Sequence, residues 1–217
     1  MAEDMKKGLF ITFEGPEGSG KSTQSGLIFD SLAADGYLSF RTAEPGGTAL
    51  GERIRDILLE RDDIRMDSVA ELFLFQADRA QHVEEVILPA IEGGKIVLCD
   101  RFNTATFAYQ GYGLGIDLDV IRCLDDIARK GLDPDLTIVL DIEVEAGIAR
   151  ATSDRMADRM EKRELDFHRK VRNGYLDMAK KSPDKIKVIG TSGPVEDVYR
   201  KVRKEVYDLI EGHKRTD

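Results

Sequence analysis

Cysteine and histidine are scarce in this sequence of 217 residues. The two cysteines, Cys99 and Cys123, form no C-x-x-C pair, which argues against a disulfide framework and against a metal site built on cysteine. The three histidines, His82, His168 and His213, are too far apart in the sequence to form a local set of metal ligands. We therefore predict that both cysteines are core thiols, and we assign the histidines no chemistry.

Long apolar runs and an excess of positive charge are also missing. No segment approaches the ~18 apolar residues of a membrane span, and the start MAEDMKKGLF lacks the apolar stretch of a signal peptide, so we expect a cytoplasmic protein with no membrane partner. The formal net charge of −9 argues against a nucleic-acid partner, because domains that bind nucleic acid usually carry a basic face. No linker or repeat interrupts the chain, so we predict one domain over residues 1–217.

One stretch, FEGPEGSGKST at residues 13–23, concentrates glycine between a strand pattern and a helix pattern. Residues 15–22 fit G-x-x-x-x-G-K-[ST], a loop whose backbone N–H groups surround phosphates. In this motif the lysine reaches the outer phosphates and the hydroxyl after it binds Mg²⁺. A glycine turn with a chance lysine is the alternative, and the flanking strand and helix argue against it. The predicted nucleotide-binding residues are Gly15, Pro16, Glu17, Gly18, Ser19, Gly20, Lys21, Ser22 and Thr23.

Short apolar segments alternate with longer amphipathic ones along the whole chain. This alternation predicts an α/β sandwich with a mainly parallel sheet and right-handed crossovers. The predicted strands cover 9–14, 38–42, 95–100, 136–142 and 185–190. The predicted helices cover 21–36, 48–60, 67–91, 117–129, 164–181 and 195–210.

Two polar turns follow predicted strands, where the ligands of parallel α/β sheets gather. AEPGGT, at residues 43–48, leads into a helix that carries Arg55, and a plain connection explains this turn equally well. DRF, at residues 100–102, places an acidic residue that can organise Mg²⁺ or its waters beside an arginine that can hold a phosphate. A solvated ion pair between Asp100 and Arg101 is the alternative.

Phe75 and Arg79 lie one helical turn apart on the same face of a predicted helix. A ring and a guanidinium with this spacing could stack on a base and form hydrogen bonds with its edge. A core ring and a solvated arginine are the ordinary explanation of the same two residues. From this segment alone both interpretations stay open.

A segment without glycine or proline, at about residues 150–163, is dense in arginine. Such a segment is typical of a mobile lid that closes over phosphates and excludes water, and a charged helical surface is the alternative. A phosphoryl-transfer enzyme needs arginines to stabilise the charge on the transferred group, and the phosphate loop contains none. The arginines of the segment are Arg150, Arg155, Arg159 and Arg163.

The segments FEGPEGSGKST, EPGGT, FQADRAQHV, DRF, TFAYQG, PDLTIVLDI and DRME follow one another over nearly the whole chain. In this order and at this spacing they resemble the thymidylate kinase family. The resemblance implies a P-loop NTPase fold, a three-layer sandwich with a five-stranded parallel sheet flanked by helices, and a homodimer. It also implies phosphorylation of dTMP to dTDP, with ATP as phosphate donor and Mg²⁺ as cofactor.

The resemblance further implies roles for single residues. Glu17 would contact the sugar 3′-hydroxyl, which accounts for a carboxylate inside a phosphate loop. Phe75 would stack on thymine, Arg79 would bond to its edge, and Arg55 and Arg101 would hold the dTMP phosphate. The other predicted substrate-binding residues are Pro45, Thr106 against the base, Tyr109 where it disfavours a ribose 2′-hydroxyl, and Gln110 beside the sugar.

The predicted catalytic groups are Lys21, Arg101 and an arginine of the lid. The family divides by whether its catalytic arginine lies in the phosphate loop or in the lid, and Gly18 stands where the first type carries a basic residue. This sequence therefore resembles the lid type. The alignment within the lid is loose, and the predicted arginines are Arg150, Arg155 and Arg159.

Three positions depart from the family pattern: Ala43, Phe102 and Ala105 replace a common arginine, a tyrosine or histidine, and a serine. None of them removes a group that the chemistry requires. One rival interpretation is a kinase for another pyrimidine nucleoside monophosphate, such as dUMP. Another is a protein that binds nucleotides without turnover. A GTPase-type switch would need a guanine-reading N-K-x-D element, which the sequence lacks.

Overall fold

The computed structural model describes residues 7–59, 65–153, 156 and 158–214. Its five strands are all parallel and form one sheet in the order β2-β3-β1-β4-β5. The chain leaves the central strand β1 toward one side of the sheet and later continues on the other, so a crevice opens beyond its carboxyl end. The strands are β1 (Phe10–Glu14), β2 (Ser39–Ala43), β3 (Ile96–Asp100), β4 (Leu136–Asp141) and β5 (Ile186–Gly190).

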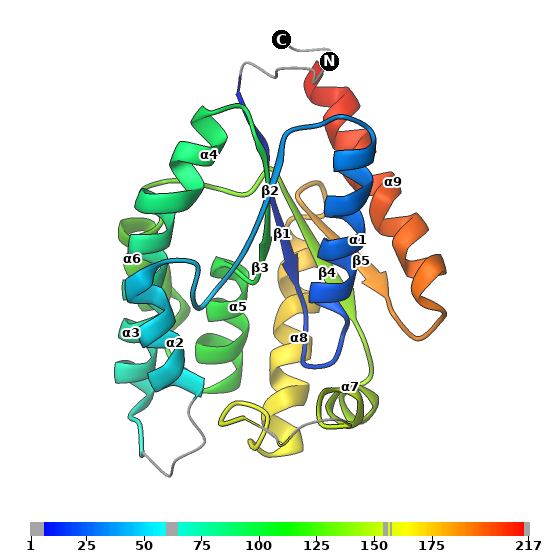
Figure 1. Ribbon diagram of the computed structural model, residues 1–217. Helices are drawn as coiled ribbons and strands as arrows, with labels where there is room; N and C mark the ends of the chain where they lie inside the picture. Colours follow the sequence, from blue (N-terminus) through cyan, green and yellow to red (C-terminus); the bar gives the residue numbers. More distant parts are fainter. Residues whose placement is uncertain (1–6, 60–64, 154–155, 157, 215–217) are drawn as a thin grey trace.

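Helices cover both faces of the sheet, which confirms the predicted three-layer α/β fold (Figure 1). On one face lie α1 (Lys21–Ala34) and α9 (Val195–Lys214). The helical segments on the other face and around the carboxyl edge are α2 (Ala49–Leu59), α3 (Ser68–His82), η1 (Val83–Ile87), α4 (Leu88–Glu92), α5 (Asn103–Thr106), η2 (Phe107–Gly113), α6 (Leu118–Ala128), α7 (Val144–Ala151) and α8 (Leu165–Lys181). No helix in the described ranges is both long and apolar enough to cross a membrane.

The alternation of side chains along β1 fixes how the layers pack. Leu9, Ile11 and Phe13 point to the face covered by α1 and α9, whereas Phe10 points to the face covered by η1 and α4. All five residues of the strand are buried, as expected of a central strand covered on both faces. Because successive residues serve opposite cores, Glu14 at the end of β1 points to the second face.

The predicted continuous helix over residues 67–91 is wrong in detail. The structure has α3, then the π-helical turn η1, then α4, with Pro89 in the first turn of α4. A proline inside an α-helix lacks an N–H and clashes with the carbonyl four residues earlier. The wider π-turn before Pro89 accommodates this residue, and the chain continues in the same direction.

Two further features differ from the sequence predictions. Residues 103–113, for which no helix was predicted, form α5 and the π-helical η2. Cys99 is a buried core thiol as predicted, but Cys123 is exposed on α6, so its prediction as a core thiol is wrong. Cys123 lies on the same stripe of α6 as the exposed Val120 and Ile127, a side of the helix that faces away from the sheet.

Candidate active site

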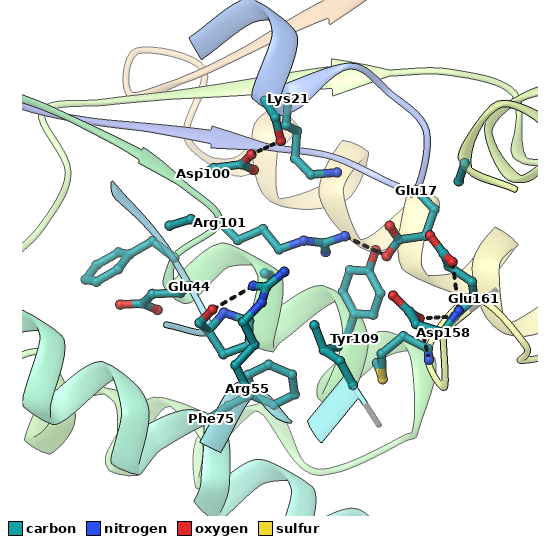
Figure 2. A pocket seen from close by; sticks show the side chains of 18 of the residues that line it. Glu17, Lys21, Glu44, Arg55, Phe75, Asp100, Arg101, Tyr109, Asp158 and Glu161 are labelled. Atoms are coloured by element: carbon teal, nitrogen blue, oxygen red, sulfur yellow. Dashed lines mark hydrogen bonds and ion pairs between the residues drawn. The ribbon is translucent and has the colours of Figure 1, made fainter. Parts of the chain in front are cut away.

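A cavity of about 490 Å³ lies beyond the carboxyl ends of the strands (Figure 2). Its lining comes from the phosphate loop, the turns after β2 and β3, the segments α2, α3, α5, η2 and α7, and the turn that begins at Asp158. Most predicted site residues line it: Glu17, Gly18, Gly20, Lys21, Ser22, Thr23, Pro45, Arg55, Phe75, Arg79, Asp100, Arg101, Thr106, Tyr109, Gln110 and Arg150. The predicted Gly15, Pro16 and Ser19 belong to the same loop but are not among the lining residues.

Lys21 is the first residue of α1, and its side chain folds back onto the phosphate loop that precedes it. Its ammonium donates to the carbonyl oxygens of Gly15 at 3.0 Å and Pro16 at 2.9 Å. Burial lowers the pKa of Lys21 to about 8, and the neighbouring Arg101 acts in the same direction. A phosphate anion beside this ammonium would favour its charged form and raise the pKa again.

The phosphate loop touches α7 through two glycines. A Cβ atom on Gly18, whose φ is +66°, would lie 1.9 Å from the carbonyl oxygen of Gly147. A Cβ atom on Gly147 would lie 2.3 Å from the carbonyl oxygen of Glu17. Backbone therefore packs directly on backbone here, and only glycine fits at either position.

Ser22 and Asp100 meet at the junction of α1 and β3. The Ser22 hydroxyl donates to Oδ2 of Asp100, and both residues line the cavity beside Lys21. Two hard oxygen donors suit Mg²⁺. In the described part of the chain no three or more His, Cys, Asp or Glu side chains are arranged to hold a metal ion, so a cation here would take most of its ligands from phosphate and water.

Arg101 crosses the middle of the cavity. Its φ of +68° places the side chain over the ring of Tyr109, 5.0 Å from the centroid, with Nη2 2.6 Å from Oε1 of Glu17. The Tyr109 hydroxyl donates to the same carboxylate at 2.7 Å. Burial acts to raise the pKa of Glu17, but the positive charges of Arg101 and Lys21 outweigh it and lower the pKa to about 2.

Arg79 lies at the other end of the cavity, with its side chain only 2% exposed. It forms ion pairs with Glu44 at 2.9 Å and Asp125 at 3.2 Å, and its Nη1 donates to the Thr106 hydroxyl at 3.0 Å. The guanidinium also lies 5.1 Å from the ring centroid of Phe102. The solvated arginine that the sequence left open is thereby excluded, because Arg79 is the hub of a buried polar network.

The turn after β2 brings Arg55 toward this network. Arg55 Nη1 donates to the carbonyl oxygen of Pro45 at 2.7 Å, and the peptide bond between Glu44 and Pro45 is cis. Phe75 projects into the same end of the cavity from α3, as Figure 2 shows. A ring, two guanidinium groups and a row of polar side chains therefore surround one space.

The predicted lid arginines occupy different places. Arg150 lines the cavity and donates to the carbonyl oxygen of Thr191 at 3.2 Å. Arg159 lies outside the cavity lining, with an ion pair to Glu71 at 2.6 Å. Arg155 lies outside the described residues.

Several acidic residues of this region were not singled out from the sequence. Asp158 and Glu161 line the cavity, and burial together with the charges of Glu161 and Glu17 raises the pKa of Asp158. Glu14, wholly buried, accepts hydrogen bonds from the N–H groups of Phe102 at 2.8 Å and Ala105 at 3.3 Å. The available signal was an acidic residue inside an otherwise apolar segment, as in LFITFE for Glu14 and AELFLF for Glu71.

One cavity thus has a phosphate loop on one side and an aromatic ring beside an arginine on the other. Comparison with known proteins shows which family has such a site. The family model for thymidylate kinase matches residues 13–202. The chain belongs to the thymidylate kinase family. Membership makes it a kinase, an enzyme that transfers a phosphoryl group.

Individual relatives support this membership over nearly the full length. The chain is 48% identical to the thymidylate kinase of Desulfovibrio desulfuricans over 205 residues, which cover 91% of this chain and 94% of the relative. It is 44% identical to the thymidylate kinase of Clostridium novyi over 201 residues, covering 92% and 98%. The crystal structure of thymidylate kinase from Ehrlichia chaffeensis superposes with a TM-score of 0.75 at 35% identity, covering 92% of this chain and 99% of that one.

Proposed function

We propose that the protein transfers the γ-phosphoryl group of ATP to dTMP and gives dTDP. The observation that carries this proposal is that one cavity has the phosphate loop at one end and Phe75 with Arg79 at the other. Arg101 lies between the two ends, where the phosphate of an acceptor nucleotide would meet the outer phosphate of the donor. The family names of the relatives agree with this acceptor.

At the phosphate end the chemistry needs positioning and charge neutralisation more than proton removal. The acceptor oxygen of a nucleoside monophosphate is already anionic, so no strong general base is required. Lys21 would hold the donor phosphates, and Arg101 with Arg55 would hold the acceptor phosphate. Arg150, already in the cavity, is our first choice for the lid arginine that stabilises the transferred group.

Mg²⁺ is the cofactor we propose for this end. Ser22 would bind it directly and Asp100 directly or through water, since both oxygens line the cavity beside the loop. When bound, the cation would supply positive charge that neutralises the phosphates. The hydrogen bond between Ser22 and Asp100 keeps the two donors together.

At the nucleoside end the ring of Phe75 would stack on thymine and Arg79 would approach the edge of the base. Thr106 and Gln110 line the same space, and Tyr109 would leave no room for a ribose 2′-hydroxyl. Glu17, held ionised by its cationic neighbours, would accept a hydrogen bond from the sugar. We further propose that the chain acts as one domain over residues 1–217, with the segment at about 150–163 serving as the lid.

A coupled ADP-release assay with ATP and Mg²⁺ tests the proposal, with dTMP, dUMP, dCMP, dGMP and AMP offered separately. We expect strong preference for dTMP. Turnover with a different acceptor would retain the phosphate machinery and refute the roles of Phe75, Arg79 and Thr106. Binding of nucleotides without turnover of any acceptor would refute the enzymatic proposal itself.

We also propose a homodimer, as family resemblance implies. In the described structure α3 and α6 pack side by side, and their outer faces carry large exposed apolar side chains. Val69 and Phe73 on α3 are 47% and 54% exposed, and Val120 and Ile127 on α6 are 51% and 70% exposed. A patch that joins two helices is typical of a protein interface, not of scattered surface residues.

Sedimentation at micromolar concentration tests the dimer. Ile127→Lys places a charge at the most exposed position of the patch, and we expect it to shift the protein toward monomer without lowering Tm of the monomer fold. Val195→Lys, at an exposed apolar position on the opposite side of the sheet, is the control and should leave the oligomeric state unchanged. A wild-type monomer at this concentration would refute the dimer.

A further inference from the structure

Glu71 is a buried carboxylate that stands beside the cavity without lining it. On α3 it precedes Phe75 by one helical turn and Arg79 by two, so the three side chains share one face of the helix. A buried carboxylate is costly unless hydrogen bonds satisfy its oxygens. Its partners therefore indicate which parts of the molecule it connects.

One oxygen of Glu71 orients a residue of the cavity. Oε1 accepts a hydrogen bond from the side-chain Nε2 of Gln110 at 2.8 Å. Because an ionised carboxylate can only accept, Gln110 must turn its NH₂ group toward Glu71, and its carbonyl oxygen remains for the cavity. A nucleoside in the cavity therefore meets a fixed acceptor at Gln110, which is complementary to an N–H or O–H group.

The other oxygen of Glu71 holds the turn at residues 158–163. Oε2 lies 2.6 Å from Nη1 of Arg159 and 2.8 Å from Nη2 of Arg163. Arg159 also donates to the carbonyl oxygen of Leu58 at the end of α2, at 2.8 Å. The guanidinium of Arg163 lies 4.7 Å from the ring centroid of Phe167.

Two arginines of one turn thus share a single buried carboxylate oxygen. Their side chains are 16% and 25% exposed, so neither ion pair is fully solvated, and charge-assisted bonds at such sites are among the stronger ones in proteins. Removing the carboxylate charge would leave both cations without this partner. It would also free the amide of Gln110 to turn over.

We propose that Glu71 is a positioning residue that links the nucleoside end of the cavity to the 158–163 turn. One carboxylate fixes the orientation of Gln110 and anchors the turn through Arg159 and Arg163, so the shape of the acceptor site and the placement of the lid depend on each other. This deepens the proposed function and rests on it for the identity of the acceptor. It also assigns Arg159 an anchoring role in the arrangement described.

Glu71→Gln tests the proposal, since the amide keeps the size of the side chain and removes its charge. We expect hydrogen exchange in peptides covering 158–167 to accelerate about tenfold or more, because the N–H groups of Met160 and Glu161 are held only while this turn keeps its shape. KM for dTMP should rise about tenfold to a hundredfold, with KM for ATP changed by no more than about twofold.

A change in selectivity separates positioning from a merely structural role. At ring position N3 thymine presents an N–H donor, which a fixed acceptor at Gln110 favours, whereas cytosine presents an acceptor there. An amide at Gln110 that is free to turn accommodates both, so the ratio of kcat/KM for dTMP over dCMP should fall in Glu71→Gln. Uniform loss of activity with all acceptors and an unchanged ratio would refute the positioning of Gln110.

Two further variants keep the test decisive. Arg163→Gln approaches the same contact from its partly exposed side, and we expect the same accelerated exchange even where Glu71→Gln fails to fold. Glu145→Gln removes an exposed carboxylate that pairs with Arg169 at 2.5 Å on α7 and α8, and it should behave as wild type. Exchange in Arg163→Gln within about twofold of wild type would overturn the anchoring. Accelerated exchange in a protein that does not use dTMP would uphold the anchoring and refute the proposed function instead.

Discussion

Two arginines line the cavity, Arg79 at its nucleoside end and Arg101 nearer the phosphate loop, and the protein neutralises them to different degrees. Arg79, at the nucleoside end, pairs with both Glu44 and Asp125, and its side chain is 2% exposed. Arg101, nearer the phosphate end, pairs with one carboxylate among the described residues, that of Glu17, and its side chain is 21% exposed. The same residue type is therefore part of the folded framework at one end and an accessible charge at the other.

The difference follows from what each end is proposed to bind. A base is neutral, so a guanidinium that meets it needs its charge balanced by the protein. A phosphate is an anion and supplies the balancing charge itself, so an arginine there retains positive potential. We therefore expect substitutions at the nucleoside end to lower stability and substitutions at the phosphate end to lower turnover.

The largest expected effect is at Lys21. Lys21→Ala removes the ammonium that would neutralise the donor phosphates, and we expect kcat to fall on the order of a thousandfold or more. The coupled assay gives kcat, and an unchanged Tm confirms the fold. Turnover near that of wild type would show that Lys21 is not a catalytic residue. It would also refute the expectation that substitutions at the phosphate end lower turnover.

The next effect compares the two arginines directly. Arg79→Ala takes a buried cation away from Glu44 and from Asp125, which then pairs with Arg129 alone of the two arginines, and we expect unfolding free energy to fall by about 3–5 kcal/mol. Arg101→Ala breaks a partly exposed pair and should cost about 1 kcal/mol or less, while abolishing most turnover. Urea unfolding measures both variants. Equal destabilisation would show that Arg101 belongs to the framework as well.

Glu14 gives a smaller effect that depends on pH. Burial raises the pKa of Glu14 to about 7, so the folded protein keeps a proton that the unfolded chain loses above about pH 4.5. The stability of the wild type therefore falls as pH rises from about 4.5 through 7, and the penalty is complete above that range. Glu14→Gln lacks this titration.

We expect the stability of Glu14→Gln, relative to wild type, to rise by about 2–3 kcal/mol between pH 5 and pH 8. Urea unfolding across this range measures the difference. Glu145→Gln, at an exposed carboxylate, should show no such trend. If the stability difference between Glu14→Gln and wild type does not change with pH, the carboxyl group of Glu14 has an ordinary pKa. Protonation of Glu14 would then have no influence on the turn after Arg101, from whose N–H groups it accepts hydrogen bonds.

The phosphate end of the cavity was predictable because the spacing of residues within one short motif determines where its side chains lie. G-x-x-x-x-G-K-[ST] between a strand and a helix places Lys21 and Ser22 by local geometry, and the end of β3 then places Asp100 beside them. The sheet was predictable for a similar reason, since buried parallel strands are short continuous apolar runs. Local rules suffice where neighbours in sequence are neighbours in space.

The nucleoside end of the cavity was harder to predict from the sequence, because its residues come from distant segments of the chain. Phe75 and Arg79 fit a core ring and a solvated cation as well as a pocket, and the partners of Arg79 that decide the matter, Asp125 and Thr106, come from distant segments. The sequence around Glu71 is that of an ordinary helix, and its partner Arg163 lies 92 positions further along the chain. The π-helical η2 was also missed, since nothing in its sequence distinguishes a wide turn from an irregular one.

The contact between Gly18 and Gly147 has a consequence for how the protein can move and change. Neither glycine has a side chain that could become smaller to make room for a larger residue at the other position. A substitution at one of the two positions therefore cannot be compensated by a second substitution at the other. The same contact couples the phosphate loop to α7, whose last turn carries Arg150, so any shift of the loop toward α7 would push directly on that helix. Binding at the proposed donor site would then be felt at the base of the proposed lid through backbone contacts.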